Sequence, residues 1–391
     1  MIVLKNCRVI DIRKGKVREG SLTIEDGRIS ARKRRGGADQ TIDVQGCFVF
    51  PGLITCHTHL SIVFPFHETD EKESPAITAL RCARRAMDCL EAGITTIRTV
   101  SEHHRADIHL RTMVEKGWAK APRIFSAGMG ISTTGGHGAG FGTLLADGPD
   151  EFRKCVRQEF AAGAQHIKIF ISGGIAKRGE SFDESQMIFE EVRAAVQAAK
   201  SRGSYVCAHS SGPAAISEAV GAGVLSFEHG YHLDKTVARS MKQAGCYLIP
   251  TLSVTRSPNW MKDHGFEQLT IDKAISAGSD HLESIRTAVK EGVKIVNGTD
   301  VPPGDKEVGM PMVVKEMEHM MAAGLSPLEV LKASTTVPAE LIGAKQQLGV
   351  LEPGYYADLL VVKDNPLRDV SALGKPLLVM KDGEVVIRRE I

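Results

Sequence analysis

The sequence predicts an α/β fold, a (β/α)8 TIM barrel with a small β-sandwich domain that both ends of the chain build together. Two observations predict this architecture. In the middle of the chain, helical stretches that end at a glycine lead directly into short apolar strands, and this unit recurs. Such alternation is typical of a parallel sheet. At both ends, strand-like runs turn at Asp-Gly pairs, which indicate β-hairpins.

The two ends of the chain carry short β segments. The N-terminal runs are residues 2–10, 21–30 and 41–50, with a turn at Asp26-Gly27. The C-terminal runs are residues 357–362 and 377–387, with a turn at Asp382-Gly383. Because so few strands cannot bury an apolar face alone, we expect them to pack together. The expected domains are a composite β-sandwich of residues 1–50 and 349–391, and a barrel of residues 51–348.

The barrel prediction rests on a count of strands in the middle of the chain. Six predicted strands follow the glycines at positions 93, 163, 203, 223, 245 and 292. With the apolar runs 54–59 and 123–129 the count is eight, which suits a closed barrel. An open, doubly wound sheet is the alternative. It would want a Gly-rich phosphate loop after its first strand, and the sequence has none there.

Composition indicates an ordinary globular protein. The 391 residues are 42% hydrophobic and 25% charged, and 49 basic residues nearly balance 47 acidic ones. We therefore expect no nucleic-acid partner. The N-terminus lacks a secretory apolar region, and no run of about 18 apolar residues suggests a membrane span. Eight scattered cysteines are expected as buried thiols of a cytoplasmic protein.

Two histidines one residue apart, His57 and His59, end the first apolar run of the barrel. Alternate side chains of a strand share a face, so the pair can bind one metal ion, although alone it is equally consistent with surface histidines. Further ligand types lie on later predicted strands, and all but Lys168 lie at a strand's C-terminal end, where barrel enzymes do chemistry. These residues are Lys168, His209, His229 and Asp300. A single such histidine would be read as a core residue, but the full set predicts a metal site.

This combination resembles the amidohydrolase superfamily over nearly the whole chain. The matching parts are Pro51-Gly-Leu-Ile-Thr-Cys-His-Thr-His59, the four later residues, and Leu348-Gly-Val-Leu-Glu-Pro-Gly-Tyr-Tyr-Ala-Asp-Leu-Leu-Val-Val362. The resemblance implies two divalent metal ions. His57, His59 and Asp300 would hold one ion and His209 and His229 the other, with an N6-carboxylated Lys168 as the bridging ligand. Imidazole and carboxylate ligands favour Zn²⁺, with Mn²⁺ and Co²⁺ as alternatives.

Lys168 lies in an apolar segment, residues 165–171, which should lower the pKa of its amine and let the neutral form capture carbon dioxide. The alternative is an ion-pair partner inside the barrel. Asp300 is expected to accept a proton from the attacking water and to pass it to the leaving amine. His166, one layer lower, is expected in the core.

Two further residues indicate the branch of the superfamily. His137 lies in the Gly-rich loop 133–138, and Tyr231 follows His229 by two residues. In the prolidase-like and carboxypeptidase-like branch, the equivalent His and Tyr contact the carbonyl oxygen and terminal carboxylate of the substrate. The alternatives are a solvated loop histidine and a tyrosine that packs over the barrel mouth. Deamination is disfavoured, because residues 210–216 after His209 contain no carboxylate.

We therefore expect a binuclear metal-dependent amidohydrolase that cleaves the amide bond of dipeptides, Xaa-Pro or otherwise, or of N-acyl amino acids. The alternative is hydrolysis of a cyclic amide or lactone, as in imidazolonepropionase. An inactive scaffold would be expected to lack ligands, and this sequence has the full set. The resemblance also implies a small-molecule substrate and a homo-oligomer. Glu102-His103-His104, after the second strand, is expected to be a solvated loop.

Overall fold

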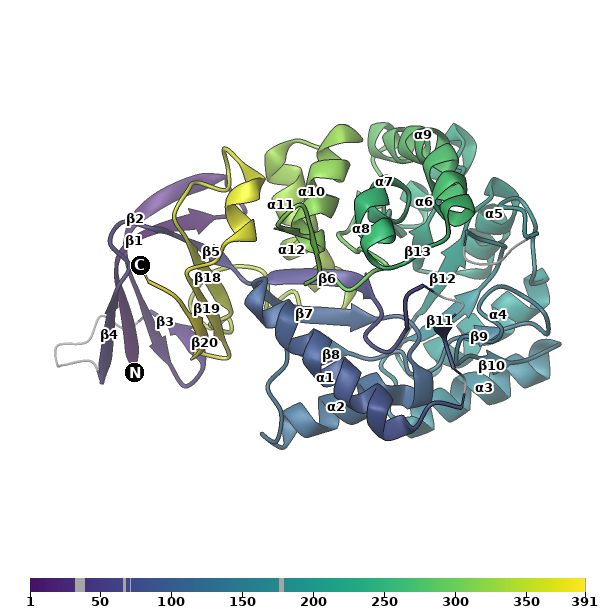
Figure 1. The fold of residues 1–391 in the computed structure, drawn as a ribbon, viewed down its shortest axis with the longest axis horizontal. Helices are drawn as coiled ribbons and strands as arrows, with labels where there is room; N and C mark the ends of the chain where they lie inside the picture. Colours follow the sequence, from purple (N-terminus) through teal and green to yellow (C-terminus); the bar gives the residue numbers. More distant parts are fainter. Residues whose placement is uncertain (32–38, 66–67, 71, 176–178, 391) are drawn as a thin grey trace.

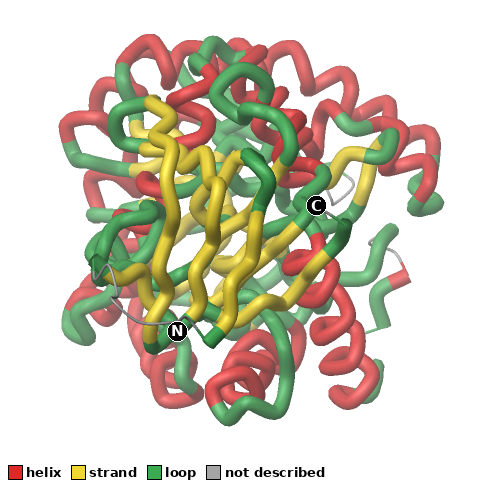
Figure 2. The backbone as a smooth tube through the Cα atoms, turned by 90° about the vertical axis from the view of Figure 1, so that its left-hand side faces the viewer, coloured by secondary structure: helices red, strands yellow, loops and turns green. Residues whose placement is uncertain are grey.

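The computed structural model describes residues 1–31, 39–65, 68–70, 72–175 and 179–390. Both ends of the chain lie in one eight-stranded sheet (Figures 1 and 2). Its strand order is β20-β19-β18-β5-β1-β2-β3, and β4 pairs with β1. The N-terminal strands are β1 (Ile2–Asp11), β2 (Lys16–Glu25), β3 (Arg28–Ser30), β4 (Gln40–Asp43) and β5 (Phe48–Pro51). The C-terminal strands are β18 (Leu359–Val362), β19 (Leu378–Lys381) and β20 (Glu384–Arg388). The expected joining of the two ends in one small β unit is confirmed.

The two Asp-Gly turns of this sheet have the geometry that their sequence predicts. Asp26 and Gly27 have φ angles of 50° and 75°, and Asp382 and Gly383 have φ angles of 51° and 78°. Positive φ at both central residues defines a type I′ turn, whose twist matches the flanking strands. Apolar side chains such as Leu4 and Val361 form a separate core under the sheet.

Two sheets of the middle segment consist of parallel strands. One sheet contains β6 (Leu53–Thr58), β7 (Ile94–Thr99) and β8 (Arg123–Phe125). A seven-stranded sheet has the order β10-β9-β11-β12-β13-β14-β15. Its strands are β9 (Ile131–Ser132), β10 (Leu144–Leu145), β11 (Ile167–Phe170), β12 (Val206–Ser210), β13 (Ser226–His229), β14 (Tyr247–Ile249) and β15 (Lys294–Ile295). The predicted α/β class with parallel strands is confirmed, while β9 and β10 were not predicted.

Backbone hydrogen bonds connect the two parallel sheets at both ends. Beyond β15, Asn297 O accepts from Cys56 N at 2.8 Å, and Thr299 N donates to His57 O at 3.0 Å. Beyond β8, Gln165 N donates to Ser126 O at 2.8 Å. The C-terminal ends of β6 and β15 therefore lie together, which brings His57 and Asp300 into one region.

Helices alternate with these strands along the chain (Figure 1). Several end at the predicted glycines: Gly163 and Gly292 are left-handed C-caps, with φ angles of 112° and 80°. The helices are α1 (Pro75–Glu91), α2 (Ala106–Glu115), α3 (Pro149–Ala162), α4 (Phe189–Lys200), α5 (Pro213–Ala222), α6 (Lys235–Gln243), α7 (Ser253–Arg256), α8 (Pro258–Asp263), α9 (Gln268–Glu291), α10 (Met312–Ala322), α11 (Pro327–Ala333) and α12 (Thr336–Leu341), with 3-10 turns η2 (His103–Arg105) and η3 (Val370–Gly374). The short strands β16 (Lys306–Glu307) and β17 (Met310–Pro311) pair as a hairpin.

Every residue of β6, β7, β11 and β12 is buried, as is usual for parallel strands that are covered on both faces. Seven of the eight cysteines are buried and Cys47 is partly buried; all eight are free thiols, as expected. Among the helices of the described residues, none combines the length and the apolar character that a membrane crossing requires.

Candidate active site

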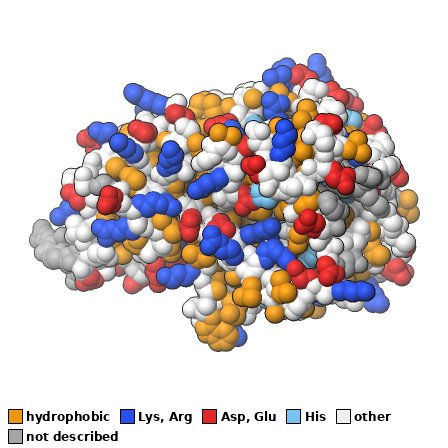
Figure 3. Space-filling view, viewed as in Figure 1, with side chains coloured by type: hydrophobic (Ala, Val, Ile, Leu, Met, Phe, Trp, Pro, Cys, Tyr) orange, Lys and Arg blue, Asp and Glu red, His pale blue; other side chains and the backbone are white. Residues whose placement is uncertain are grey.

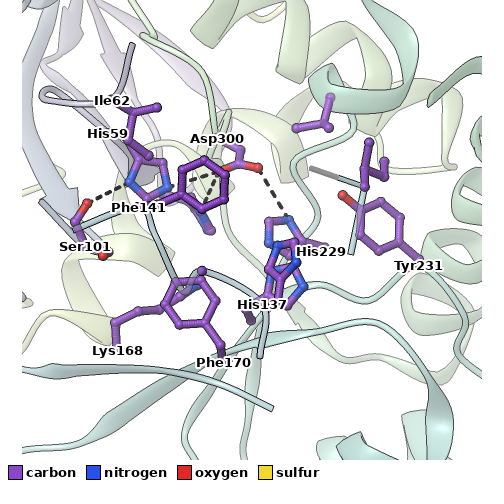
Figure 4. A pocket seen from close by; sticks show the side chains of 15 residues that line it. His59, Ile62, Ser101, His137, Phe141, Lys168, Phe170, His229, Tyr231 and Asp300 are labelled. Atoms are coloured by element: carbon purple, nitrogen blue, oxygen red, sulfur yellow. Dashed lines mark hydrogen bonds and ion pairs between the residues drawn. The ribbon is translucent and has the colours of Figure 1, made fainter. Parts of the chain in front are cut away.

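All predicted metal ligands line one cavity, which opens at the C-terminal ends of the parallel strands (Figure 4). His57 and His209 are the penultimate residues of β6 and β12, His229 is the last residue of β13, and Lys168 lies on β11. His59 and Asp300 follow β6 and β15. His137 and Tyr231 line the same cavity. The cavity has about 660 Å³ of empty space, part of which is open to solvent.

The ligand atoms of three of these side chains lie close together. Asp300 Oδ1 is 2.9 Å from His57 Nε2 and 3.1 Å from His59 Nε2. His57, His229 and Asp300 each offer one ligand atom, and these atoms lie within 4.8 Å of one another. His57 Nε2 is buried and makes no hydrogen bond of ordinary geometry. Its lone pair is thus available to a metal ion, and this donor set suits a divalent transition metal.

The Nδ1 atom of His57 contacts a buried ion pair between Glu228 and Arg98. This atom lies 2.6 Å from Glu228 Oε2, and Arg98 donates to the other oxygen of that carboxylate at 2.7 Å. Burial alone raises the pKa of Glu228, but Arg98 and His57 outweigh it, and the pKa lies well below its usual range. An ionised carboxylate on Nδ1 fixes the ring orientation and directs Nε2 into the cavity.

The other histidines have partners on their second nitrogen as well. His59 Nδ1 lies 2.9 Å from the carbonyl oxygen of Ser101, and His229 Nδ1 lies 2.7 Å from Thr251 Oγ1. His209 Nε2 is 3.3 Å from Gly173 O. Burial holds the pKa values of His209 and His229 well below 6.5, so both rings are neutral and able to bind metal.

Lys168 is buried, with 1% of its surface exposed. Burial lowers the pKa of its amine, and the negative charge of Glu228 only partly opposes this effect. Its Nζ lies 5.1 Å from the centre of the Phe170 ring. These surroundings favour the neutral amine over the ammonium form.

His137 and Tyr231 are both fixed within the cavity. His137 is 7% exposed, its Nδ1 lies 2.5 Å from Glu180 Oε2, and its ring stacks on His209 at 4.2 Å. The alternative of a solvated loop residue is therefore wrong for His137. Tyr231 is 2% exposed and stacks against both His229 and Phe182.

The expectation of a solvated loop at Glu102-His103-His104 is wrong. Glu102 is fully buried and His103 is 5% exposed, and only His104 is exposed. The Glu102 carboxylate is buried because it accepts hydrogen bonds from the backbone N–H groups of Leu60 and Ser61, which have no strand partner there. The expectation for His166 is confirmed: it is 1% exposed, with Nε2 3.0 Å from Thr99 O.

Sequence reasoning missed the residues that contact and orient the histidines of the cavity, directly or through a partner, namely Arg98, Glu180, Glu228 and Thr251. Glu228 directly precedes His229. Neighbouring residues of a regular strand face opposite sides, so Glu228 would be expected to point away from the cavity. His229, however, has a φ angle of 72°, which departs from strand geometry at this point. The available signal was a charged residue, Arg98 or Glu228, inside an otherwise uncharged buried strand.

Comparisons with known proteins agree with this arrangement. The model of the amidohydrolase family matches residues 48–386. A solved Xaa-Pro dipeptidase with methionine bound in its active site is 31% identical, with a TM-score of 0.88 over 98% of this chain and 99% of the other. A solved prolidase complexed with N-methylphosphonate-L-proline is 29% identical, with a TM-score of 0.90 over 99% of this chain and 100% of the other. Ochratoxinase of Aspergillus niger is 29% identical over 359 residues, which are 85% of this chain and 73% of that enzyme. The chain therefore belongs to the amidohydrolase family and is a hydrolase that acts on amide bonds.

Proposed function

We propose that this protein is a binuclear metal-dependent amidohydrolase that cleaves dipeptides, Xaa-Pro or with another C-terminal residue, or N-acyl amino acids. The observation that carries the proposal is the single cavity that contains six potential metal ligands together with His137 and Tyr231. The similarity to a prolidase and to an Xaa-Pro dipeptidase supports the substrate class.

The proposal includes the architecture around the cavity. The two parallel sheets, with their connecting hydrogen bonds at both ends, are proposed to form one closed (β/α)8 barrel of residues 51–348. Residues 1–50 and 349–391 are proposed to form the β-sandwich domain.

The side chains of the cavity are of the types that bind divalent metal ions. We propose that they hold two ions and that both are Zn²⁺. His57, His59 and Asp300 would hold one ion, and His209 and His229 the other. Lys168, carboxylated on its neutral amine, would be the bridging ligand. When bound, such ions polarise a carbonyl group and lower the pKa of water toward neutrality.

Asp300 is the proposed general base. Burial raises the pKa of its carboxyl group, but His57 and His59 outweigh this effect and hold the pKa well below 3.8. Asp300 is therefore ionised at neutral pH and can accept a proton from the attacking water. It then delivers that proton to the nitrogen of the leaving amine.

His137 and Tyr231 are the proposed substrate-binding pair. Burial keeps the pKa of Tyr231 well above 10, so its hydroxyl stays a neutral hydrogen-bond donor. Together with the ring of His137 it would bind the substrate's carbonyl oxygen and terminal carboxylate. The apolar side chains of Ile62, Phe141 and Val254 line the same cavity and suit an apolar part of the substrate.

The test is amine release from a library of dipeptides and N-acyl amino acids, with metal-loaded protein and with the C-terminal amides as controls. Cleavage that requires the free carboxylate supports the peptidase-like function and identifies the preferred side chain. Absence of cleavage by metal-replete protein would contradict it and favour cyclic amides or lactones.

Metal content tests the proposed role of Lys168. Lys168→Ala should bind fewer than two metal ions per chain, because the bridging ligand is lost. The matched control is Lys273→Ala, which removes an amine on α9 that lies 3.3 Å from the Gly174 carbonyl oxygen. This control should still bind two ions. Two tightly bound ions in Lys168→Ala would remove the bridging role.

A further inference from the structure

Two buried carboxylates, Glu102 and Glu316, make the same set of contacts in two places. Glu102 follows β7 and accepts hydrogen bonds from Leu60 N and Ser61 N, each at 2.7 Å, and from the Ser61 hydroxyl. Glu316 lies on α10 and accepts from Leu252 N at 2.9 Å and from Ser253 N and Oγ, each at 2.7 Å. Both carboxylates are fully buried.

Each carboxylate holds a turn that begins directly after a residue of the metal site. Leu60 follows His59, a proposed ligand. Leu252 follows Thr251, whose Oγ1 lies 2.7 Å from His229 Nδ1. The two strands concerned, β6 and β14, carry the chain into the cavity from different parts of the sequence, so both sides of the site depend on such a contact.

The first turn is also held from the opposite direction. Arg81 and Arg85 of α1 donate to the carbonyl oxygens of residues 60–62, at distances of 2.5 to 2.9 Å. The turn therefore has both its N–H and its C=O groups bound by charged side chains. This arrangement replaces the neighbouring strand that the backbone lacks at this point.

Only a carboxylate can make this contact in full. Its two oxygens accept from two successive N–H groups and still accept from a serine hydroxyl. A glutamine of the same shape has one acceptor oxygen, and its amide NH₂ would face one of the N–H donors. The buried N–H would then be left without a partner, and the turn would have to shift.

We propose that Glu102 and Glu316 are positioning residues of the active site, which fix the backbone beside His59 and Thr251 and thereby the orientation of His59 and His229. The inference rests on the proposed function, because it takes these histidines to be metal ligands. Neither glutamate lines the cavity, so each acts through the turn that it holds.

The experiment measures the affinity of the full-length protein for Zn²⁺ by competition with a chelator, together with the thermal midpoint of unfolding. Glu102→Gln and Glu316→Gln should each bind Zn²⁺ at least about tenfold more weakly, as is usual when a group that orients a metal ligand is lost. Glu316→Asp keeps two acceptor oxygens and should retain more of the affinity than Glu316→Gln.

The matched control is Asp358→Asn. Asp358 is also a buried carboxylate that accepts a backbone N–H, but it lies beside the terminal sheet. Asp358→Asn should lower the thermal midpoint and leave the Zn²⁺ affinity unchanged. If Glu102→Gln and Glu316→Gln behave in the same way, with Zn²⁺ affinity within twofold of the parent, the positioning role is overturned.

Ser61→Ala and Ser253→Ala keep the proposal testable if the glutamine variants do not fold. Each removes one hydroxyl from the contact and leaves the buried carboxylate in place, so severalfold weaker Zn²⁺ binding is expected. Unchanged binding in both serine variants would overturn the inference. The parent is measured first: failure of the parent to bind Zn²⁺ would contradict the proposed function itself, whereas normal parent binding with unchanged variants contradicts only the role of the two glutamates.

Discussion

Asp300 combines two properties that a regular strand residue does not have. Its φ angle is 62°, in the left-handed region, and its carboxylate lies between the rings of His57 and His59. His229 and Thr251 also have positive φ angles, of 72° and 49°. Such conformations cost free energy in non-glycine residues and persist where the surroundings hold them. Here the backbone N–H of Asp300 donates to His57 O at 3.1 Å, which ties the carboxylate to the first ligand strand.

Asp300→Asn should lose turnover by several orders of magnitude while it retains part of its metal. The amide cannot accept a proton from water, but its oxygen remains a ligand atom. Steady-state turnover and metal content of the same preparation give the answer. The control Asp305→Asn changes an acid that binds the Trp260 side chain at 3.2 Å, and it should keep its turnover. Near-normal activity of Asp300→Asn would remove Asp300 from the role of base.

Glu228→Gln should weaken metal binding by about 10- to 100-fold, since the oriented carboxylate on His57 Nδ1 is lost. It should also lower the free energy of unfolding by about 3 to 5 kcal/mol, because Arg98 is left as a buried charge without its partner. Chelator competition and urea unfolding measure the two effects. Loss of stability with unchanged metal affinity would show that the Arg98–Glu228 ion pair stabilises the core and does not orient His57.

At the scale of the elements, the sequence predicted the strands but not the turns after β6 and β14, which distant buried carboxylates hold. Helices that end at glycine and lead into apolar runs predicted the strands, and their common direction brought His57, His209 and His229 together. The turns themselves were not predictable, because their partners are distant in sequence. Glu102 and Glu316 bind backbone groups 41 to 64 residues away, and no local pattern contains that information.

The insertion after β14 illustrates the same limit. The sequence alone does not fix the conformation of residues 253–268, and most of them form the short helices α7 and α8. Trp260 of α8 is buried between Phe64 and His264, at ring distances of 5.2 and 4.0 Å. Helices of six residues or fewer have little stability of their own. Tertiary packing therefore decides their conformation, and a single sequence does not reveal it.

Glu316, which lies on α10, predicts that the stability of the folded protein depends on pH. Burial raises the pKa of this carboxyl group from 4.5 to about 7. Between these values the folded state binds more protons than the unfolded state, so the stability of the parent falls as the pH rises from 4.5 to 7. In Glu316→Gln this contribution is absent. The stability difference, parent minus variant, should decrease by up to about 3 kcal/mol over this interval.

Urea unfolding of the metal-free parent and of Glu316→Gln, at pH values from 4.5 to 7.5, measures this difference. Comparison of the two proteins cancels the contributions of the other titrating groups, including Glu102. A difference that is constant over the interval would contradict a raised pKa at Glu316. A difference that increases with pH would mean that the hydrogen bonds to the turn lower the pKa by more than burial raises it.

At the scale of the whole molecule, the terminal sheet and the parallel strands are joined by a partly buried ion pair. Arg123 of β8 donates to Asp358 at 2.6 Å and pairs with Asp382 in the turn between β19 and β20. Its guanidinium also lies 4.4 Å from the centre of the Tyr356 ring. On the face seen in Figure 3, basic and acidic side chains are interspersed. The contact at Arg123 differs from these because Asp358 is only 6% exposed.

Arg123→Met should therefore lower the free energy of unfolding at pH 7.5 by about 3 kcal/mol, because Asp358 is left buried without its cation. Burial already raises the pKa of Asp358 even beside Arg123, and loss of the cation should raise it further. The variant can then relieve the cost by protonation, so the destabilisation should be smaller at pH 5 than at pH 7.5. Urea unfolding at both pH values measures the effect, and Arg239→Met, which breaks an exposed pair with Glu291, serves as a control that should change little. A loss that is equal at the two pH values would place the contribution of Arg123 in its packing on Tyr356 instead of its charge.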